Sequence, residues 1–251
     1  MTRTAAISSA CSTDLAHARS LVLFDGDLPS VLAVAYAAEE ASLPSRRSAS
    51  SRVIRSANLS ATHDRRQPSD SGPAPAPVVY PAYFGLPDAR ERAVALARVL
   101  DVFSVDRAAD DAPPLSTRPD AGGEDQTRLL VHAGYLALAR GCDRVVWPTQ
   151  HGEDLHTESP SLERIAGAID RALLVTRVVA LDAPRAADAP EIDTPFVDLT
   201  DRQIAEMVMD IEAPLSGCWW WGGSTPTALA ARDRWGTLLR SLGWGGALGP
   251  G

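Results

Sequence analysis

The stretch Leu21-Val-Leu-Phe-Asp-Gly-Asp-Leu-Pro-Ser30 decides the fold that this sequence predicts. Its first four residues form a short apolar run that is typical of a buried strand. The polar turn Asp25–Ser30 follows, and the Ala- and Leu-rich residues from Val31 to about Ala41 predict a helix. Pro29 and Ser30 both suit the first positions of that helix. A strand, a tight turn with glycine and a helix together indicate the opening of a βα unit.

The rest of the chain repeats this alternation. Strands are predicted at residues 78–80, 102–105, 144–147 and 175–181, a short extended piece at 194–197, and helices at 88–100, 124–140, 161–174, 200–209 and 227–242. Thr200 and Gln203 have the spacing of a capping box, and Gly141 suits the position just after a helix. Strands that alternate with helices of this length predict an α/β fold, a doubly wound parallel sheet with helices on both faces.

We expect a single domain at residues 21–242, between a flexible N-terminus at 1–20 and a flexible Gly-rich tail at 243–251. Residues 41–77 differ from the rest of this domain, since they hold nine serines, six arginines and only two acids. Their net charge is therefore +4, in a chain whose formal net charge is −8. Without hydrophobic periodicity, this Arg/Ser/Pro-rich stretch is predicted to be a disordered insertion. The alternative is a basic arm that contacts RNA.

The composition excludes one class of catalytic mechanism and indicates the cellular compartment. All 24 basic residues are arginine, most simply through a coding bias, so mechanisms that need a lysine are excluded. Cys11, Cys142 and Cys218 lie far apart and form no CxxC pair, as expected in a reducing cytoplasm. No apolar stretch approaches the roughly 18 residues of a membrane span, and residues 1–20 have no apolar signal-peptide core. We therefore expect a cytoplasmic protein without a membrane partner.

The ligand crevice of a doubly wound sheet lies beyond the carboxyl ends of its strands. Three segments are expected to meet there: Asp25–Ser30, Gln150–Asp154 and Cys218–Gly223. In the first segment, Asp25, Asp27 and Ser30 either cap the following helix, which is the favoured interpretation, or form part of a ligand or metal site.

The other two segments also allow two interpretations each. His151, Glu153, Asp154 and His156 could act as metal ligands and proton carriers, but solvated loop residues are favoured because no HExxH spacing is present. Trp219-Trp-Trp221 could stack on a purine-like base. It could equally be an aromatic plug of structural importance, which we favour.

Several segments together resemble one family of enzymes. Leu21–Ser30 is similar to the PP-loop of the N-type ATP pyrophosphatases, in which a strand is followed by Ser-Gly-Gly-x-Asp-Ser and a helix. The 7-cyano-7-deazaguanine synthase family within that superfamily has further similar segments in the same order. Their counterparts here are Gly141-Cys-Asp-Arg-Val-Val146, His151-Gly-Glu-Asp154, Asp193-Thr-Pro-Phe-Val-Asp-Leu-Thr-Asp-Arg-Gln-Ile204, Ala213-Pro-Leu-Ser-Gly-Cys-Trp219 and a late arginine, Arg232 or Arg234.

The resemblance implies an adenine nucleotide alpha hydrolase-like, Rossmann-like fold and a defined reaction. Family members use ATP with Mg²⁺ to activate the carboxylate of 7-carboxy-7-deazaguanine as an adenylate, which ammonia converts to a nitrile in queuosine biosynthesis. Nucleotide binding then falls on Asp25, Gly26, Asp27 and Ser30, where backbone N–H groups would surround a pyrophosphate. The implied pocket for a small purine-like ligand contains Gln126, His151, Glu153, Asp154, Trp219 and Arg232.

The sequence departs from the family where the chemistry is done. Asp25, Asp27 and Pro29 replace the loop's first serine, second glycine and aspartate, and the two added carboxylates would repel a polyanion. Asp201 replaces a lysine, and Gly123-Glu-Asp-Gln-Thr127 replaces a Pro-x-Arg-Asn motif. Only Cys218 remains of the four cysteines that usually hold a structural zinc, so zinc is predicted to be absent.

These observations lead to three hypotheses about function. The first is a divergent synthase homologue with a degenerate loop, either a pseudoenzyme or a protein with an altered small-molecule ligand. The second is an active ATP-dependent carbon–nitrogen ligase of the 7-cyano-7-deazaguanine synthase type that tolerates the acidic loop through Mg²⁺. The third is an RNA-associated protein that binds through residues 41–77.

Overall fold

The computed structural model describes residues 19–42, 75–83, 85–108, 122–152 and 161–246. Within them, five parallel strands form one sheet in the order β3-β2-β1-β4-β5. The strands are β1 (Ser20–Phe24), β2 (Val78–Pro81), β3 (Asp106–Arg107), β4 (Arg144–Val146) and β5 (Glu191–Asp193). Every pair is parallel, and Val22 of β1 lies between Val79 of β2 and Val146 of β4. The predicted α/β sheet is confirmed.

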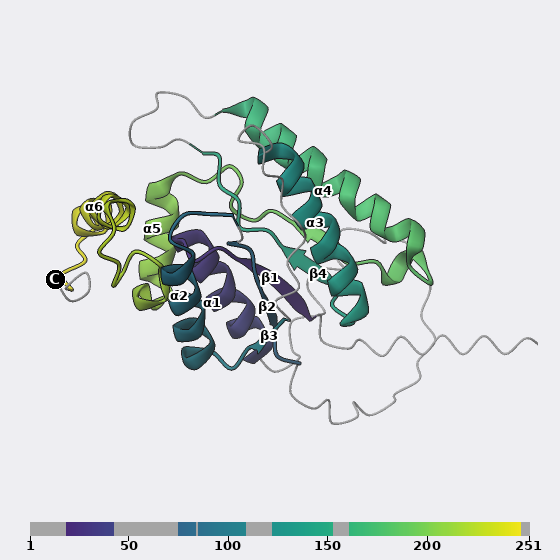
Figure 1. The fold of residues 1–251 in the computed structure, drawn as a ribbon, viewed down its shortest axis with the longest axis horizontal. Helices are drawn as coiled ribbons and strands as arrows, with labels where there is room; N and C mark the ends of the chain where they lie inside the picture. The colour runs from purple at the N-terminus through teal and green to yellow at the C-terminus, as the bar shows by residue number, and fades with distance from the viewer. Residues whose placement is uncertain (1–18, 43–74, 84, 109–121, 153–160, 247–251) are drawn as a thin grey trace, which may run out of the picture.

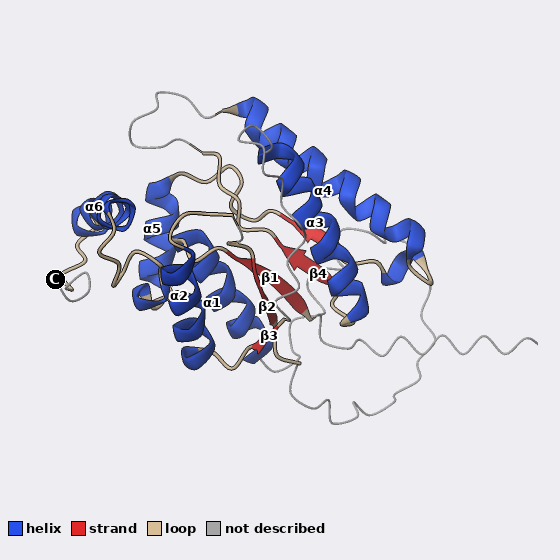
Figure 2. Ribbon diagram, in the orientation of Figure 1, coloured by secondary structure: helices blue, strands red, loops and turns tan. Residues whose placement is uncertain are grey.

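Helices cover both faces of this sheet (Figures 1 and 2). They are α1 (Leu28–Ser42), α2 (Ala89–Val102), α3 (Gly122–Ala139), α4 (Leu162–Asp182), α5 (Asp201–Asp210) and α6 (Pro226–Ser241), with short 3₁₀ turns η1 (Ala186–Asp188) and η2 (Leu215–Gly217). Side chains alternate across a strand, so the apolar run of β1 supplies two cores. Val22 and Phe24 pack with α1, α2, α5 and α6, whereas Leu21 and Leu23 pack with α3 and α4.

The order of the strands places the crevice. From β1 the chain proceeds to β2 and β3 on one side and later to β4 and β5 on the other. The direction of winding therefore reverses between β1 and β4, and ligands of such sheets bind at the carboxyl ends of those two strands. The segments that leave these ends begin at Asp25 and Trp147.

Local signals in the sequence set several ends of these helices. Thr200 caps α5 with its side chain, and Gln203 returns a bond to the Thr200 N–H, so the capping box is confirmed. Gly141 has φ +64°, and the N–H of Cys142 reaches the carbonyl of Ala137 across it. This is the left-handed helix end that glycine favours, as predicted.

The predicted strand at residues 175–181 is wrong. Residues 175–181 belong to α4, because Ala168, Ala172, Val175 and Val179 form a buried stripe at helical spacing against α3. That burial outweighs the preference of a valine-rich run for a strand. The last strand of the sheet is instead β5, in which Ile192 is the buried residue.

The predicted strand at 102–105 is also misplaced. Helix α2 continues to Val102 and ends where Phe103 adopts an extended conformation. The strand β3 follows at Asp106–Arg107 and pairs only with β2, at the edge of the sheet, with both residues exposed. Residues 194–197, expected to be extended, form a turn in which the Val197 N–H donates to the Thr194 carbonyl.

The remaining expectations on organisation are only partly testable. Helix α1 extends to Ser42 and β2 begins at Val78, whereas residues 43–74 of the predicted insertion lie outside the described part of the chain. The same holds for residues 1–18 and 247–251 of the predicted flexible ends. None of the helices in the described ranges combines the length and apolar character that a membrane span requires.

The close approach of α3 and α4 predicts the effect of a methyl group at Gly134. A Cβ atom there would lie 2.7 Å from Cγ2 of Val179. We expect Gly134→Ala to lower the free energy of unfolding by about 1–3 kcal/mol through overpacking. Gly167→Ala on α4 is the matched control, since a Cβ atom there meets no atom within 4 Å. It should stabilise by up to about 1 kcal/mol. Equal effects of the two variants in urea unfolding would contradict this packing.

Candidate functional site

The turn between β1 and α1 uses its own N–H groups internally. Gly26 N–H donates to Ser30 Oγ (3.0 Å), and Asp27 N–H donates to Asp25 Oδ1 (2.9 Å). Leu28 N–H donates to Asp27 Oδ1 (2.9 Å), while Ser30 N–H and Val31 N–H both donate to the Asp27 carbonyl (3.0 and 3.1 Å). Pro29 has no N–H. Every backbone donor from Gly26 to Val31 therefore has an acceptor inside the turn.

This pattern removes the usual attraction of a helix N-terminus for phosphate. An anion binds there because the first N–H groups have no partner within the helix. In α1 those groups bond to Asp27 or are absent at Pro29, and Ser30 is completely buried. Gly26 has φ +86°, which favours glycine, and a Cβ atom there would lie 3.2 Å from Cβ of Trp219.

Asp27 is the centre of the candidate site. Besides the Leu28 N–H, its Oδ1 atom accepts the indole N–H groups of Trp220 (3.2 Å) and Trp235 (3.1 Å). Both tryptophans are buried, at 0% and 1% exposure. One carboxylate oxygen thus joins the start of α1 to the turn after η2 and to helix α6.

Burial of these groups changes their ionisation. Desolvation, followed by repulsion from Asp25, raises the pKa of Asp27. Desolvation, followed by repulsion from Asp27 and Asp25, raises the pKa of the Cys218 thiol well above 9.0. The thiolate is the form that acts as a nucleophile or a metal ligand, and this burial disfavours it at Cys218.

Trp219 and Arg92 close the other side of the turn. The Trp219 N–H donates to the Gly26 carbonyl (2.9 Å), and the Arg92 guanidinium lies 4.5 Å from the centre of the Trp219 ring. Arg92 also donates to the backbone carbonyls of Asp25 and Pro87. Among the described residues, Trp219 Nε1 is the buried side-chain polar atom that lacks a hydrogen-bond partner.

Arg232 and Arg234, the two candidates for a late arginine, have different partners. Arg232 donates to the backbone carbonyls of Trp220 and Gly223. It therefore holds the turn at Trp219–Trp221, called the tryptophan turn below, against α6. Arg234 forms an ion pair with the buried Asp201, with 3.0 Å between Nε and Oδ2. Gln150, from the segment after β4, donates to Asp201 Oδ1 (3.0 Å).

The three segments expected at this edge are therefore connected in different ways. The turn at Asp25–Ser30 contacts the tryptophan turn directly, whereas Gln150 is joined to α6 through the Asp201–Arg234 pair. Glu153, Asp154 and His156 of the predicted cluster lie outside the described residues.

Gln126 and His151 lie in a second group, around Arg171 of α4. Gln126 Oε1 accepts from Arg171 (2.8 Å), and His151 Nε2 lies 3.3 Å from Thr149 Oγ1. Burial, then the charges of Arg164 and Arg171, lower the pKa of His151. Among the described residues, the partners of His151 and Gln126 are Thr149 and Arg171, so they form a group separate from the Asp27 carboxylate.

The implied metal and nucleotide do not fit the residues of the turn. Asp27 Oδ1 is occupied by three N–H donors, and the N–H groups that would bind a pyrophosphate are satisfied. Across the described ranges, no group of three or more His, Cys, Asp and Glu side chains is arranged to hold a metal ion.

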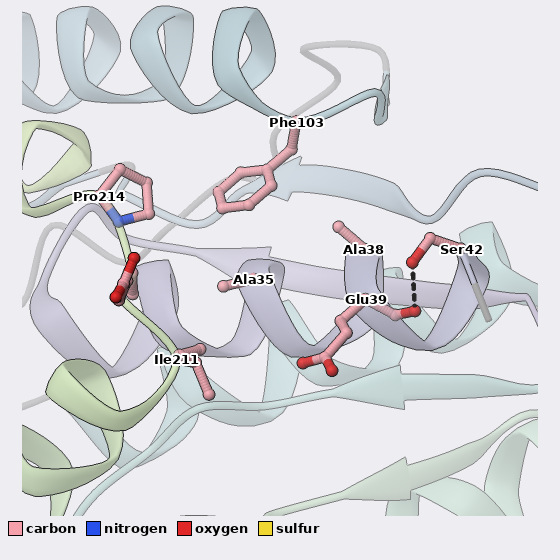
Figure 3. Close-up of a pocket in the computed structure, with 9 residues that line it drawn as sticks. Ala35, Ala38, Glu39, Ser42, Phe103, Ile211 and Pro214 are labelled. Carbon is pink, nitrogen blue, oxygen red and sulfur yellow. Dashed lines mark hydrogen bonds between the residues drawn. The ribbon is translucent and has the colours of Figure 1, made fainter.

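A cavity of about 340 Å³ lies away from this edge, beside the second half of α1 (Figure 3). Its walls are mostly apolar, with Glu39 and Glu212 as the acidic residues. They comprise Ala35, Ala38, Glu39, Ser42, Phe103, Ile211, Glu212, Ala213 and Pro214. The cavity contains none of the site residues that the sequence predicts, and Figure 3 shows the rings of Phe103 and Pro214 on the same side of α1.

Comparison of the chain with protein-family models, with curated proteins and with solved structures found no match.

Sequence reasoning missed the partners of Asp27. Trp220 and Trp235 are 193 and 208 residues away along the chain, so no local pattern links them to the turn. The same applies to Arg92 and to the Asp201–Arg234 pair. The one available signal was an unusual density of tryptophan near the C-terminus, which indicated an aromatic cluster but not its polar centre.

Replacing Asp27 tests its structural role. Asp27→Ala leaves the indole N–H groups of two buried tryptophans without an acceptor, so we expect a loss of about 2–4 kcal/mol of stability. Asp27→Asn keeps an oxygen at the same place and should stay within about 1 kcal/mol of the wild type. Guanidinium unfolding followed by tryptophan fluorescence measures both. An Asp27→Ala variant as stable as the wild type would refute the role.

The raised pKa of Asp27 predicts a pH dependence. The folded protein keeps this proton to a higher pH than the unfolded chain, whose carboxyl titrates near 3.8. The contribution of Asp27 to stability is therefore fully present below that value and is lost as the pH rises through the folded-state pKa. Asn at this position does not titrate. The stability of the wild type relative to Asp27→Asn should fall as the pH rises above about 4. A constant difference would contradict the raised pKa.

Proposed function

We propose that this protein is a divergent homologue of the 7-cyano-7-deazaguanine synthase type that does not hydrolyse ATP. In this proposal, the segment that resembles the PP-loop is a structural junction. The observation that carries it is the hydrogen bonding of the turn, where each N–H from Gly26 to Val31 has an acceptor within the turn. A pyrophosphate would have to displace these bonds and also face Asp25 and Asp27.

Two further contacts support this proposal. Asp201, at the place of the family's lysine, pairs with Arg234 and Gln150 rather than presenting a cation to a phosphate. The tryptophan turn at Trp219–Trp221 occupies the end of β1, where its backbone and one indole bond to Gly26 and Asp27. In this proposal, internal hydrogen bonds and an ion pair stand where an ATP-binding site would need a free positive charge.

The active-synthase alternative receives less support. It needs Mg²⁺ to neutralise the acidic turn, whereas Asp27 Oδ1 is surrounded by N–H donors and Asp25 Oδ1 accepts the Asp27 N–H. Most of the stretch on which the RNA hypothesis depends, residues 43–74, lies outside the described residues. RNA binding stays a prediction.

A second candidate function is binding of an altered small, purine-like ligand without ATP chemistry. One observation favours it: the indole N–H of Trp219 is buried without a partner among the described residues, and a hydrogen-bond acceptor on a ligand would satisfy it. Quenching of tryptophan fluorescence by a 7-deazaguanine base, lost in Trp219→Phe, would support this candidate.

Calorimetry with ATP·Mg²⁺ tests the main proposal. We expect no heat of binding for the wild type at millimolar ATP, because the turn offers no free N–H groups. The matched variant restores the family pattern through Asp25→Ser, Asp27→Gly and Pro29→Asp, and should gain measurable affinity provided that circular dichroism shows it folded. Binding by the wild type would overturn the proposal. A folded variant that binds nothing would instead count against the resemblance.

A further inference from the structure

Helix α4 presents an apolar face away from the core. Its inner stripe at Ala168, Ala172, Val175 and Val179 is buried. Its outer face carries six of the eleven large apolar side chains that are exposed among the described residues, namely Leu162, Ile169, Leu173, Leu174, Val178 and Leu181. Leu173 and Leu174 are 50% and 59% exposed at the middle of the helix. Such a concentration on one element marks an interaction surface.

The outer face of α4 lies along one side of the molecule beside α3 (Figure 1). The helix has 21 residues and is therefore about 31 Å long, enough for a continuous helix–helix contact. Tyr135 of α3 is also exposed and donates to Asp182 at the end of α4, so the apolar surface extends toward α3.

The charges on this face identify its partner. Glu163, Asp170 and Arg177 are spaced by seven residues and so lie almost on one line along α4, with a drift of about 20° at each step. The two acids are in the N-terminal half and the arginine is in the C-terminal half. Asp170 and Arg177 are exposed, and neither bonds to another described residue. This arrangement is complementary to itself when two such helices run antiparallel.

We propose that the outer face of α4 binds the same face of a second copy of this chain, in an antiparallel pair around a two-fold axis between Leu173 and Leu174. This register places Leu173 of one copy against Leu174 of the other and Ile169 against Val178. It also places Asp170 against Arg177 twice, once on each side of the axis.

Alternative arrangements are electrostatically worse. A parallel pair would set Asp170 against Asp170 and Arg177 against Arg177, and like charges in close contact are unfavourable. A lipid surface would meet the acids Glu163 and Asp170 at its anionic headgroups. The isologous pair instead buries the central leucines and sets Asp170 of each copy against Arg177 of the other, so that the same patch of each copy meets itself, as a two-fold interface requires.

Charge reversal tests both the surface and the register. We expect the full-length wild type to dimerise in sedimentation velocity at micromolar to submillimolar concentrations. Asp170→Arg and Arg177→Asp should each weaken the homodimer by at least about tenfold, because each sets like charges against each other. An equimolar mixture of the two variants should regain a dimer, since each then supplies what the other lacks.

Matched controls separate this surface from general effects. Arg90→Asp on α2 and Leu229→Arg on α6 alter exposed residues elsewhere and should leave the dimer unchanged. Circular dichroism verifies that every variant is folded. A wild type that stays monomeric, variants that dimerise like the wild type, or a mixture that stays monomeric would each overturn the proposal. Failure here would leave the proposal about ATP untouched, because α4 is remote from the turn at Asp27.

Discussion

The bonds of two buried tryptophans to one carboxylate oxygen hold the candidate site together. Asp27 Oδ1 accepts from Trp220 and Trp235 and from the first N–H of α1. A buried indole N–H without an acceptor is costly, so each tryptophan requires the carboxylate and the carboxylate requires them. The result is a hydrogen-bonded joint between the first βα unit, the turn after η2 and helix α6.

That joint also involves the N–H groups at the start of α1, which are the groups that bind an anion in other sheets of this kind. The strand order places the usual ligand position of such sheets at the ends of β1 and β4. Asp27 Oδ1 is the acceptor for the first N–H group of α1, where a phosphate oxygen would otherwise bind, and the tryptophan turn covers it. In our proposal, the N–H groups of the turn between β1 and α1 are hydrogen-bonded within the protein. These bonds stabilise the fold and leave no N–H groups to bind a nucleotide.

The two cores differ in what surrounds them. On the side of α1, α2, α5 and α6, the core ends in the polar network of Asp27, Asp201 and Arg234. On the side of α3 and α4, small residues such as Gly134 and Ala172 bring the helices close together. Close packing of α4 with its inner stripe leaves its large apolar residues on the outside, and this is the physical origin of the surface that we assign to a second copy.

The amino-acid sequence by itself determined the elements whose signals are local. The strand of β1, the turn with Gly26, the capping box at Thr200 and the helix end at Gly141 follow from propensity and hydrogen bonding within a few residues. It also determined the α/β class, because alternating apolar strands and helices allow few other arrangements. Where two patterns competed, as in the valine-rich end of α4, burial against α3 decided for a helix.

Only the tertiary structure decided what the polar residues do. Asp27 in the sequence could be a cap, a metal ligand or part of a nucleotide loop, and its partners are about 200 residues away. Asp201 and Arg234 are likewise 33 residues apart and lie on different helices. Hydrogen bonds and desolvation act over a few ångströms in space, and distance along the chain carries no information about them. The role of a residue such as Asp27 is therefore set by the fold that surrounds it.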